Sequence, residues 1–161
     1  MVATSITASS RYINVGTTVV YWVPTISNPA SPTRAELNAG TNLVNENSAS
    51  SGWSVKTDLV ETPTMASRFT SKIPGRIIAD DSSLTMYRDL GGTDAVALMP
   101  VNATGYVVWL DAGDVTGRNM DVYPVTVASH SKSRSTDGKE AVTVEIMYAI
   151  TNVPSENVSI P

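Results

Sequence analysis

Residues 141–150, AVTVEIMYAI, carry the clearest pattern in the sequence. Their side chains alternate between two sets of different polarity, as in a β-strand whose two faces meet different surroundings. The more apolar set is Val142, Val144, Ile146, Tyr148 and Ile150. The other set is Ala141, Thr143, Glu145, Met147 and Ala149. The pattern predicts a strand between a core and a surface that is only partly wetted.

Similar patterns occur along much of the chain, in which Val and Ile outnumber Leu. β-Branched residues favour strands over helices. Further strands are therefore predicted at 17–23, 53–59, 65–73, 84–88, 106–110 and 120–128. Pro74-Gly75 is expected to form a turn after the 65–73 strand, and Pro124 implies an edge or a bulge. The chain is predicted to be mainly β.

One short helix is expected at residues 33–39. Thr33 and Glu36 have the spacing of a capping box, and Gly40 is a suitable stop.

A length of 161 residues favours one domain. Within 1–161 we expect an N-terminal arm at 1–16, a mobile loop at 45–52 and a proline-broken C-terminal tail at 152–161. Deleting residues 1–12 or 152–161 is expected to impair contacts between subunits more than subunit folding.

Composition excludes several classes of function. The chain has no Cys and one His, which argues against disulfide scaffolds, thiol catalysis and multi-histidine metal sites. A formal charge of −4 argues against a protein that grips nucleic acid through its phosphates. The N-terminus resembles no secretory signal, and no apolar run approaches the ~20 residues of a membrane-spanning helix.

No catalytic site or cofactor is predicted. His130 has no acid near it in sequence and is expected to be a solvated loop residue. Asp80-Asp81 and Asp111 with Asp114 lie beside turn residues, where Asp normally caps backbone groups. Gly91-Gly92 belongs to no phosphate-binding motif. The tryptophans suggest two alternatives: an aromatic platform for a sugar, or core packing, which the apolar surroundings of Trp22 and Trp109 favour.

Six segments, taken together and in one order, resemble the major tail tube proteins of long-tailed bacteriophages. They are VYWVPTISNPASPTRAELNAGT (20–41), SGWSVKTDLVETP (51–63), SRFTSKIPGR (67–76), DDSSLTMY (80–87), GYVVWLDAGD (105–114) and AITNVPSENVSIP (149–161). None of them is a catalytic signature, and they span nearly the whole chain.

The resemblance implies a β-sandwich or half-barrel with one flanking helix, six copies of which close into a β-barrel ring. Stacked rings would form the tail tube of the virion, and this tube would conduct DNA during ejection. The tail would be assembled in the host cytoplasm. The implied partners are further copies of the chain, the tape measure, the tail tip and the terminator; no membrane insertion is implied. The same fold serves contractile injection and secretion tubes, and a carbohydrate-binding β-sandwich remains a third alternative.

Lumen-lining residues are expected on the wetted faces of the inner strands. The candidates are Lys56, Asp58, Arg68, Lys72, Thr143 and Glu145. A wall without excess positive charge would let DNA slide, because basic walls bind it through counterion release.

Overall fold

The computed structural model describes residues 3–161. The first two residues of the arm expected at 1–16 lie outside this range, and residues 3–13 form neither helix nor strand. The chain is mainly β, with 44% strand and 6% helix, which confirms the predicted fold class. The helices are α1 (Arg34–Asn38) and α2 (Ala95–Leu98).

Within residues 3–161, ten strands make up the remaining regular structure. They are β1 (Val19–Val23), β2 (Thr41–Asn42), β3 (Asn47–Ser51), β4 (Val55–Thr62), β5 (Ser71–Ala79), β6 (Ser82–Tyr87), β7 (Thr104–Leu110), β8 (Asn119–Ser133), β9 (Thr143–Ile150) and β10 (Ser155–Ser159).

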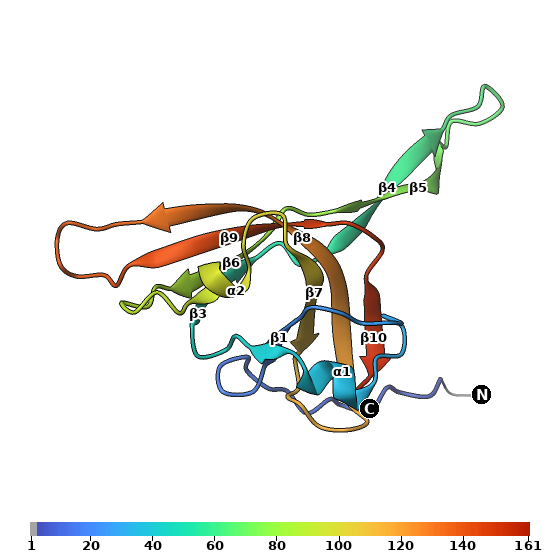
Figure 1. Ribbon diagram of the computed structural model, residues 1–161. Coiled ribbons are helices and arrows are strands. Elements are labelled where there is room, and N and C mark those ends of the chain that lie inside the picture. The colour runs from blue at the N-terminus through green and yellow to red at the C-terminus, as the bar shows by residue number, and fades with distance from the viewer. Residues whose placement is uncertain (1–2) are drawn as a thin grey trace.

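A single antiparallel sheet forms the body, in the order β2-β1-β7-β8-β9-β6-β3, with β10 also paired to β8 (Figure 1). The long strand β8 joins its two halves. Residues 121–126 of β8 pair with β7, and residues from Val125 to Ser133 pair with β9. A register shift between Val127 and Ser129 bends the strand. The sheet therefore folds over on itself but does not close into a barrel within one subunit.

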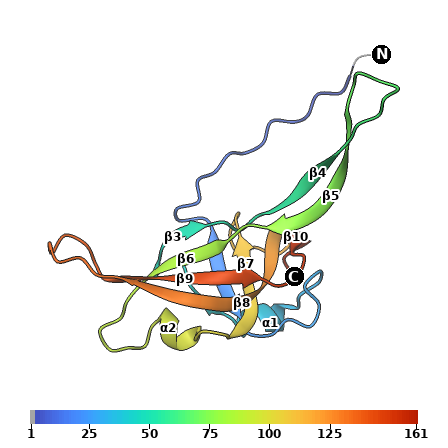
Figure 2. The ribbon, with the colours of Figure 1, turned by 90° about the horizontal axis from the view of Figure 1, so that it is seen from above.

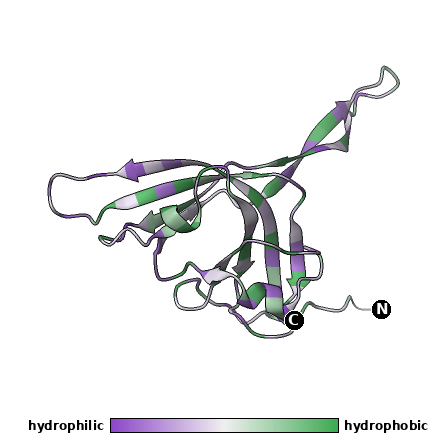
Figure 3. Cartoon of the chain, viewed as in Figure 1, coloured by the Kyte–Doolittle hydropathy of each residue, from purple (hydrophilic) through white to green (hydrophobic). Residues whose placement is uncertain are grey.

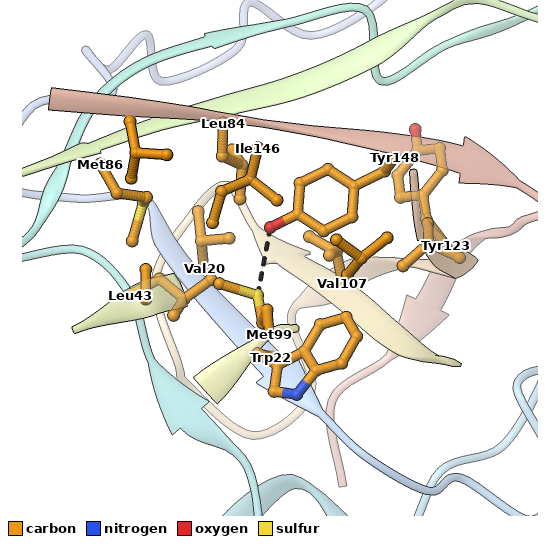
Figure 4. Packing of buried hydrophobic residues seen from close by; sticks show 14 residues of the cluster. Val20, Trp22, Leu43, Leu84, Met86, Met99, Val107, Tyr123, Ile146 and Tyr148 are labelled. Atoms are coloured by element: carbon orange, nitrogen blue, oxygen red, sulfur yellow. Dashed lines mark hydrogen bonds between the residues drawn. The ribbon is translucent and has the colours of Figure 1, made fainter. Parts of the chain in front are cut away.

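The main hydrophobic core lies between the two halves of this folded sheet. Val20 and Trp22 of β1 meet Leu84 of β6 and Ile146 and Tyr148 of β9 there (Figure 4). The Tyr148 hydroxyl donates to Met99 Sδ at 3.1 Å, so this buried polar group is satisfied. Strand β9 thus has the predicted arrangement: Val144, Ile146 and Tyr148 are buried, whereas Glu145 and Met147 are exposed.

A second core covers the opposite face of β1, β7 and β8. Leu37 of α1 and Ile160 near the C-terminus pack there against Val108 and Val122. Because β7 contributes Val107 to the first core and Val108 to the second, it is the central buried strand that its sequence predicts.

The close contact between β7 and β1 depends on Gly105. A Cβ atom at this buried position would lie 2.7 Å from the Trp22 ring and 3.1 Å from the carbonyl oxygen of Val23. Gly105→Ala is therefore expected to lower the free energy of unfolding by about 1–3 kcal/mol, measured by urea denaturation. Adding Trp22→Phe makes room, so the double variant should lose less than the sum of the single variants. An unchanged stability of Gly105→Ala would contradict this packing.

Helix α1 forms as the sequence predicts. The Thr33 hydroxyl accepts from the Glu36 N–H, and the Glu36 carboxylate accepts from the Thr33 N–H at 2.7 Å. A second Glu36 oxygen accepts from the Ser27 N–H, also at 2.7 Å, and so fixes the preceding loop.

Two predicted irregular segments, and the loop expected around His130, have regular structure instead. Residues 45–52, expected as a loop, contain β3, which pairs with β6 although its sequence NSASS is polar. The expected tail at 152–161 contains β10, which pairs with β8, and Ile160 is 1% exposed. The polar residues 129–133 extend β8 beside β9. In each case pairing with a distant strand outweighs low local propensity.

The partner of β4 also differs from the prediction. Strand β5 begins at Ser71 and runs through Pro74 and Gly75 to Ala79, so the turn lies at residues 63–70 and not at Pro74-Gly75. Pro74 is tolerated because the two-stranded β4–β5 hairpin has a free edge at β5.

Pro124 marks neither an edge nor a bulge. It lies opposite Tyr106 of β7, between the residues of β8 that pair with β10 and those that pair with β9. The missing N–H thus falls where β8 changes partners on that side.

Candidate assembly surface

The hairpin β4–β5 projects from the body of the subunit (Figures 1 and 2). It continues the β3–β6 pair: Ser51 is opposite Ser83, and Val55 is opposite Ala79. Between these pairs the chain turns at Gly52 (φ 92°) and Trp53 (φ 22°). The backbone of Gly52 is tightly held, since a Cβ there would lie 2.1 Å from the Asp81 carbonyl oxygen.

Hydrophobic residues occur along the projecting hairpin (Figure 3), and the side chains of several are exposed. They are Leu59, Val60, Ile73, Ile77 and Ile78 on the strands, and Met65 and Phe69 in the connecting loop. A lone two-stranded hairpin is marginally stable in water. This surface is therefore suited to burial against another molecule.

Unpaired strand edges are a second feature of the subunit. Among the described residues, β3 pairs with β6 alone, and residues 129–133 of β8 pair only with β9. Such edges present free N–H and C=O groups to a further strand.

The face of β3, β6, β8 and β9 that points away from the main core is built of small, mostly neutral residues. It includes Ala49, Ser51, Ser83, Thr85, Ser131, Ser133, Thr143, Glu145, Met147 and Ala149, with the larger Tyr87 opposite Thr143 at one end. Glu145 is the charged member of this set. Neither α1 nor β10, which cover the second core, extends over these residues.

The six predicted lumen residues occupy two regions. Thr143 and Glu145 lie on the small-residue face of β9, next to Ser133 and Ser131 of β8. Lys56 and Asp58 lie on β4, Lys72 on β5 and Arg68 in the loop between these strands.

Alternation along β4 separates the hairpin candidates. Lys72 is opposite Glu61 and forms an ion pair with it at 3.1 Å. Lys56 and Asp58 are at even positions of β4 and therefore lie on the other face. Lys56 binds Asp80 at 2.8 Å, which is one of the hydrogen-bonded contacts that lower the pKa of Asp80. Lys72 therefore lies on one face of the hairpin, and Lys56 and Asp58 lie on the other.

The tryptophans do not form a flat exposed platform. Trp22 is 3% exposed and belongs to the main core, as its sequence context predicts. Trp53 packs against Trp109, Tyr123 and Tyr148, with ring centroids 5.4–5.7 Å apart. Its indole N–H donates to the Ser83 carbonyl at 3.0 Å, and its own carbonyl accepts from the Tyr123 hydroxyl at 2.8 Å.

A cleft of about 270 Å³ opens at the margin of this aromatic cluster. Trp53, Trp109 and Tyr123 line it together with Asp111, Asp121 and the β3 edge. Burial, and secondarily the charge of Asp121, raises the pKa of Asp111. Burial likewise raises the pKa of Tyr123 to about 12, with nearby carboxylates adding to the effect. Both shifts have the same causes, which are burial and the charge of neighbouring carboxylates.

Asp114, another acidic residue considered in the sequence, has a structural role. Asp114 accepts from Arg34 at 2.7 Å and from the Tyr21 hydroxyl at 2.8 Å, and the hydrogen bond from Arg34 is the main cause of its lowered pKa. It thereby ties α1 to the loop after β7.

His130 is not the solvated loop residue that its sequence predicts. It lies on β8 opposite Ile146, half-buried, and one ring nitrogen is 2.8 Å from the Met99 carbonyl oxygen. Its position in a strand could not be predicted from the sequence, because the polar residues at the end of β8 lack the apolar alternation of the preceding part of the strand.

Acid is expected to weaken the anchoring of α1. Hydrogen bonds from the backbone N–H groups of Thr33 and Ser27 lower the pKa of Glu36 from 4.5 to about 2. A lowered folded-state pKa stabilises the fold above the unfolded value, and this contribution disappears as pH falls from about 4.5 to about 2. The melting temperature should therefore decrease across this window. Glu36→Gln should reduce that decrease, whereas Glu140→Gln, on an exposed turn, should leave it unchanged.

An open β subunit with free strand edges and an exposed apolar hairpin has the features of an assembly subunit. A family model described as phage tail tube protein matches residues 6–161. The chain therefore belongs to the phage tail tube protein family, as its sequence segments indicated. It is a structural component of the virion tail and not an enzyme.

Solved structures have the same fold at low sequence identity. The sheath/tube terminator of an extracellular contractile injection system (PVC) is 13% identical, with a TM-score of 0.64 over 91% of this chain and 97% of that chain. The tube-terminating cap of the anti-feeding prophage is 14% identical, with a TM-score of 0.60 over 89% and 90%. A chain of the PVC sheath–tube complex is 14% identical, with a TM-score of 0.57 over 90% and 92%. No curated protein matches the chain.

None of the helices in residues 3–161 has the length and apolar character needed to cross a membrane.

Proposed function

We propose that six copies of this chain close into a ring, that rings stack into the tail tube, and that the tube conducts DNA during ejection. The observation that carries this proposal is the small-residue face of β3, β6, β8 and β9, which lies between two unpaired strand edges. A surface of this kind can line a continuous barrel when the edges of neighbouring copies pair.

The two free edges are different, which determines the type of contact. The β3 edge of one copy would pair with residues 129–133 of β8 in the next, and so on around an axis. Such head-to-tail contacts close into a ring when the rotation fits. The number six rests on the family resemblance.

Thr143 and Glu145 are the first candidates for the lumen wall, because they lie on the small-residue face. Lys56 and Asp58 on one face of the hairpin, Lys72 on its other face and Arg68 at its end are second candidates. The formal charge of −4 per subunit supports a wall that does not retain DNA. DNA would pass without sequence-specific contacts.

The whole chain, 1–161, would act as one tail-tube domain. The extended residues 3–13 pair with no strand of the described subunit, which supports a role in bridging successive rings. The tape measure, tail tip and terminator would be the further partners.

Electron microscopy of the purified, concentrated protein tests the proposal. Stacked six-fold rings with a central channel lined by Thr143 and Glu145 are the expected result. A protein that stays monomeric with the other tail components present would refute the proposal, and a map with these side chains on the outer surface would refute the lumen assignment.

A tube or terminator of a contractile injection system is the second candidate, favoured by the fold of the terminator and cap structures. The two uses differ in their partners. A contractile tube would bind a surrounding sheath, and a terminator would stop at a single ring. Long tubes without a surrounding sheath would favour the phage tail tube over both of these alternatives.

A further inference from the structure

The loop at the end of the β4–β5 hairpin combines one cation with exposed apolar groups. Residues 63–70 contain Arg68 and no acidic residue. Met65 and Phe69 beside it are 107% and 77% exposed. Within residues 3–161, Arg68 takes part in no ion pair. Arginine and aromatic residues of this kind often contribute most of the binding energy of an interface.

The aromatic cleft has the complementary chemistry. Its walls are the rings of Trp53, Trp109 and Tyr123, and its carboxylates are Asp111 and Asp121. Asp121 accepts from the Asn157 N–H at 2.7 Å, but neither carboxylate has a cationic side chain within 4.0 Å among the described residues. Aromatic faces and carboxylates together favour a guanidinium, which stacks and forms hydrogen bonds at once. The volume of about 270 Å³ suits one side chain better than a larger ligand.

The loop of the same chain cannot reach this cleft. The cleft lies at the base of the hairpin beside Trp53, and the eight residues of β4 separate it from the loop by about 26 Å. An Arg68 side chain in this cleft must therefore come from another copy of the chain. Lys132 and Arg134 fit less well, because they lie just before a loop that also carries Asp137 and Glu140.

We propose that the loop 63–70 of one copy docks into the aromatic cleft of a second copy, with Arg68 between the aromatic rings and Asp111 and Asp121, and Phe69 against the cleft margin. This contact rests on the proposed tube function and identifies one of its interfaces. It also removes Arg68 from the candidates for the lumen wall. It explains why the apolar hairpin projects from the body: the projection places the loop at a neighbouring subunit.

Cysteine cross-linking tests the contact directly, because the chain contains no Cys of its own. Ser50→Cys on the cleft rim is combined with Phe69→Cys at the loop. Oxidation of the assembled protein should give a ladder of covalent oligomers, since the hairpin length prevents a bond within one chain. Phe69→Cys with Ser31→Cys, an exposed serine that precedes α1 and lies outside both free strand edges, is the matched control and should give no ladder.

Charge exchange provides a second measurement. Arg68→Glu and Asp111→Arg should each raise the protein concentration needed for assembly about tenfold or more, because each places like charges together. The double variant should recover most of this loss. Arg76→Glu makes the same charge change on β5, away from the loop, and should have little effect. Circular dichroism verifies that each variant is folded.

The outcomes separate this contact from the tube function. If the unmodified chain never assembles, both proposals fail. If it assembles into tubes but the Ser50–Phe69 cysteine pair gives no ladder, or if the double charge variant does not recover, the docking contact is wrong and the tube function stands. A ladder together with charge recovery supports both.

Discussion

Deletion of residues 152–161 should destabilise the folded subunit by about 3 kcal/mol or more. Ile160 is 1% exposed within the second core, and removing a buried Ile side chain alone costs about 2–5 kcal/mol. The deletion also removes β10, whose pairing covers residues 119–122 of β8. Hydrogen bonds from Ile160 N–H to the Arg118 carbonyl, at 2.7 Å, and from Gly117 N–H to the Ile160 carbonyl, at 2.9 Å, are lost as well. Urea denaturation monitored by tryptophan fluorescence measures the change.

Deletion of residues 1–12 is the matched control. Residues 3–12 form no strand and Ile6 is 97% exposed, so this truncation should leave the unfolding curve unchanged. It should instead impair assembly, which sedimentation measures. The sequence alone led us to expect the same effect from both truncations. The structure instead separates an arm that contributes little to the subunit from a tail that completes its core. Equal stability of the two truncated proteins would contradict this distinction.

Replacement of Trp53 by Ala is expected to cost about 3–5 kcal/mol. Its ring contacts three other aromatic rings at centroid distances of 5.4–5.7 Å, and its N–H donates to the Ser83 carbonyl. The residue also lies at the turn between β3 and β4, so its loss should loosen the direction of the projecting hairpin. The free energy of unfolding and the protection of the β4 and β5 amides against hydrogen exchange report the two effects.

Trp53→Phe serves as the control, because it keeps an aromatic ring but cannot donate to Ser83. It should lose less than half as much stability as Trp53→Ala. Fast exchange in β4 and β5 with unchanged exchange in β9 would support the role of Trp53 in the hairpin. A Trp53→Ala protein with unaltered stability would show that the aromatic cluster is not needed for the core.

Strong local patterns allowed correct prediction of several elements. Alternation over residues 141–150 predicted β9 and its buried side chains, and the continuous apolar run at 106–110 predicted a central strand. Thr33 and Glu36 predicted α1 because both partners of the capping box lie within one helical turn. Each of these signals lies within a few residues of sequence.

The incorrect predictions concern segments whose structure depends on distant partners. The polar segment Asn47–Ser51 becomes a strand because β6 lies beside it. Residues 129–133 extend β8 because β9 lies beside them and pairs with them. Pro74-Gly75 resembles a turn, yet it lies within β5. The outer edge of β5 pairs with no further strand, so no hydrogen bond from the missing N–H of Pro74 is required there.

One candidate surface could be predicted from local sequence, and the other could not. Glu145 and Thr143 could be assigned to a wetted strand face by alternation alone. The aromatic cleft could not, because Trp53, Trp109, Tyr123, Asp111 and Asp121 come from separate parts of the chain and meet only where β3, β7 and β8 come together.

The amino-acid sequence by itself determined that this protein is mainly β, that it has a capped helix at α1, and that it belongs with tail tube proteins. These properties depend on short-range patterns and on six different segments that occur in one order along the chain. Only the tertiary structure decided that the C-terminal residues complete a core, that the β4–β5 hairpin leaves the body, and that an acidic aromatic cleft opens at its base. Those features arise from pairing and packing between residues far apart in the chain, and low local propensity does not prevent them when a distant strand supplies the missing hydrogen bonds.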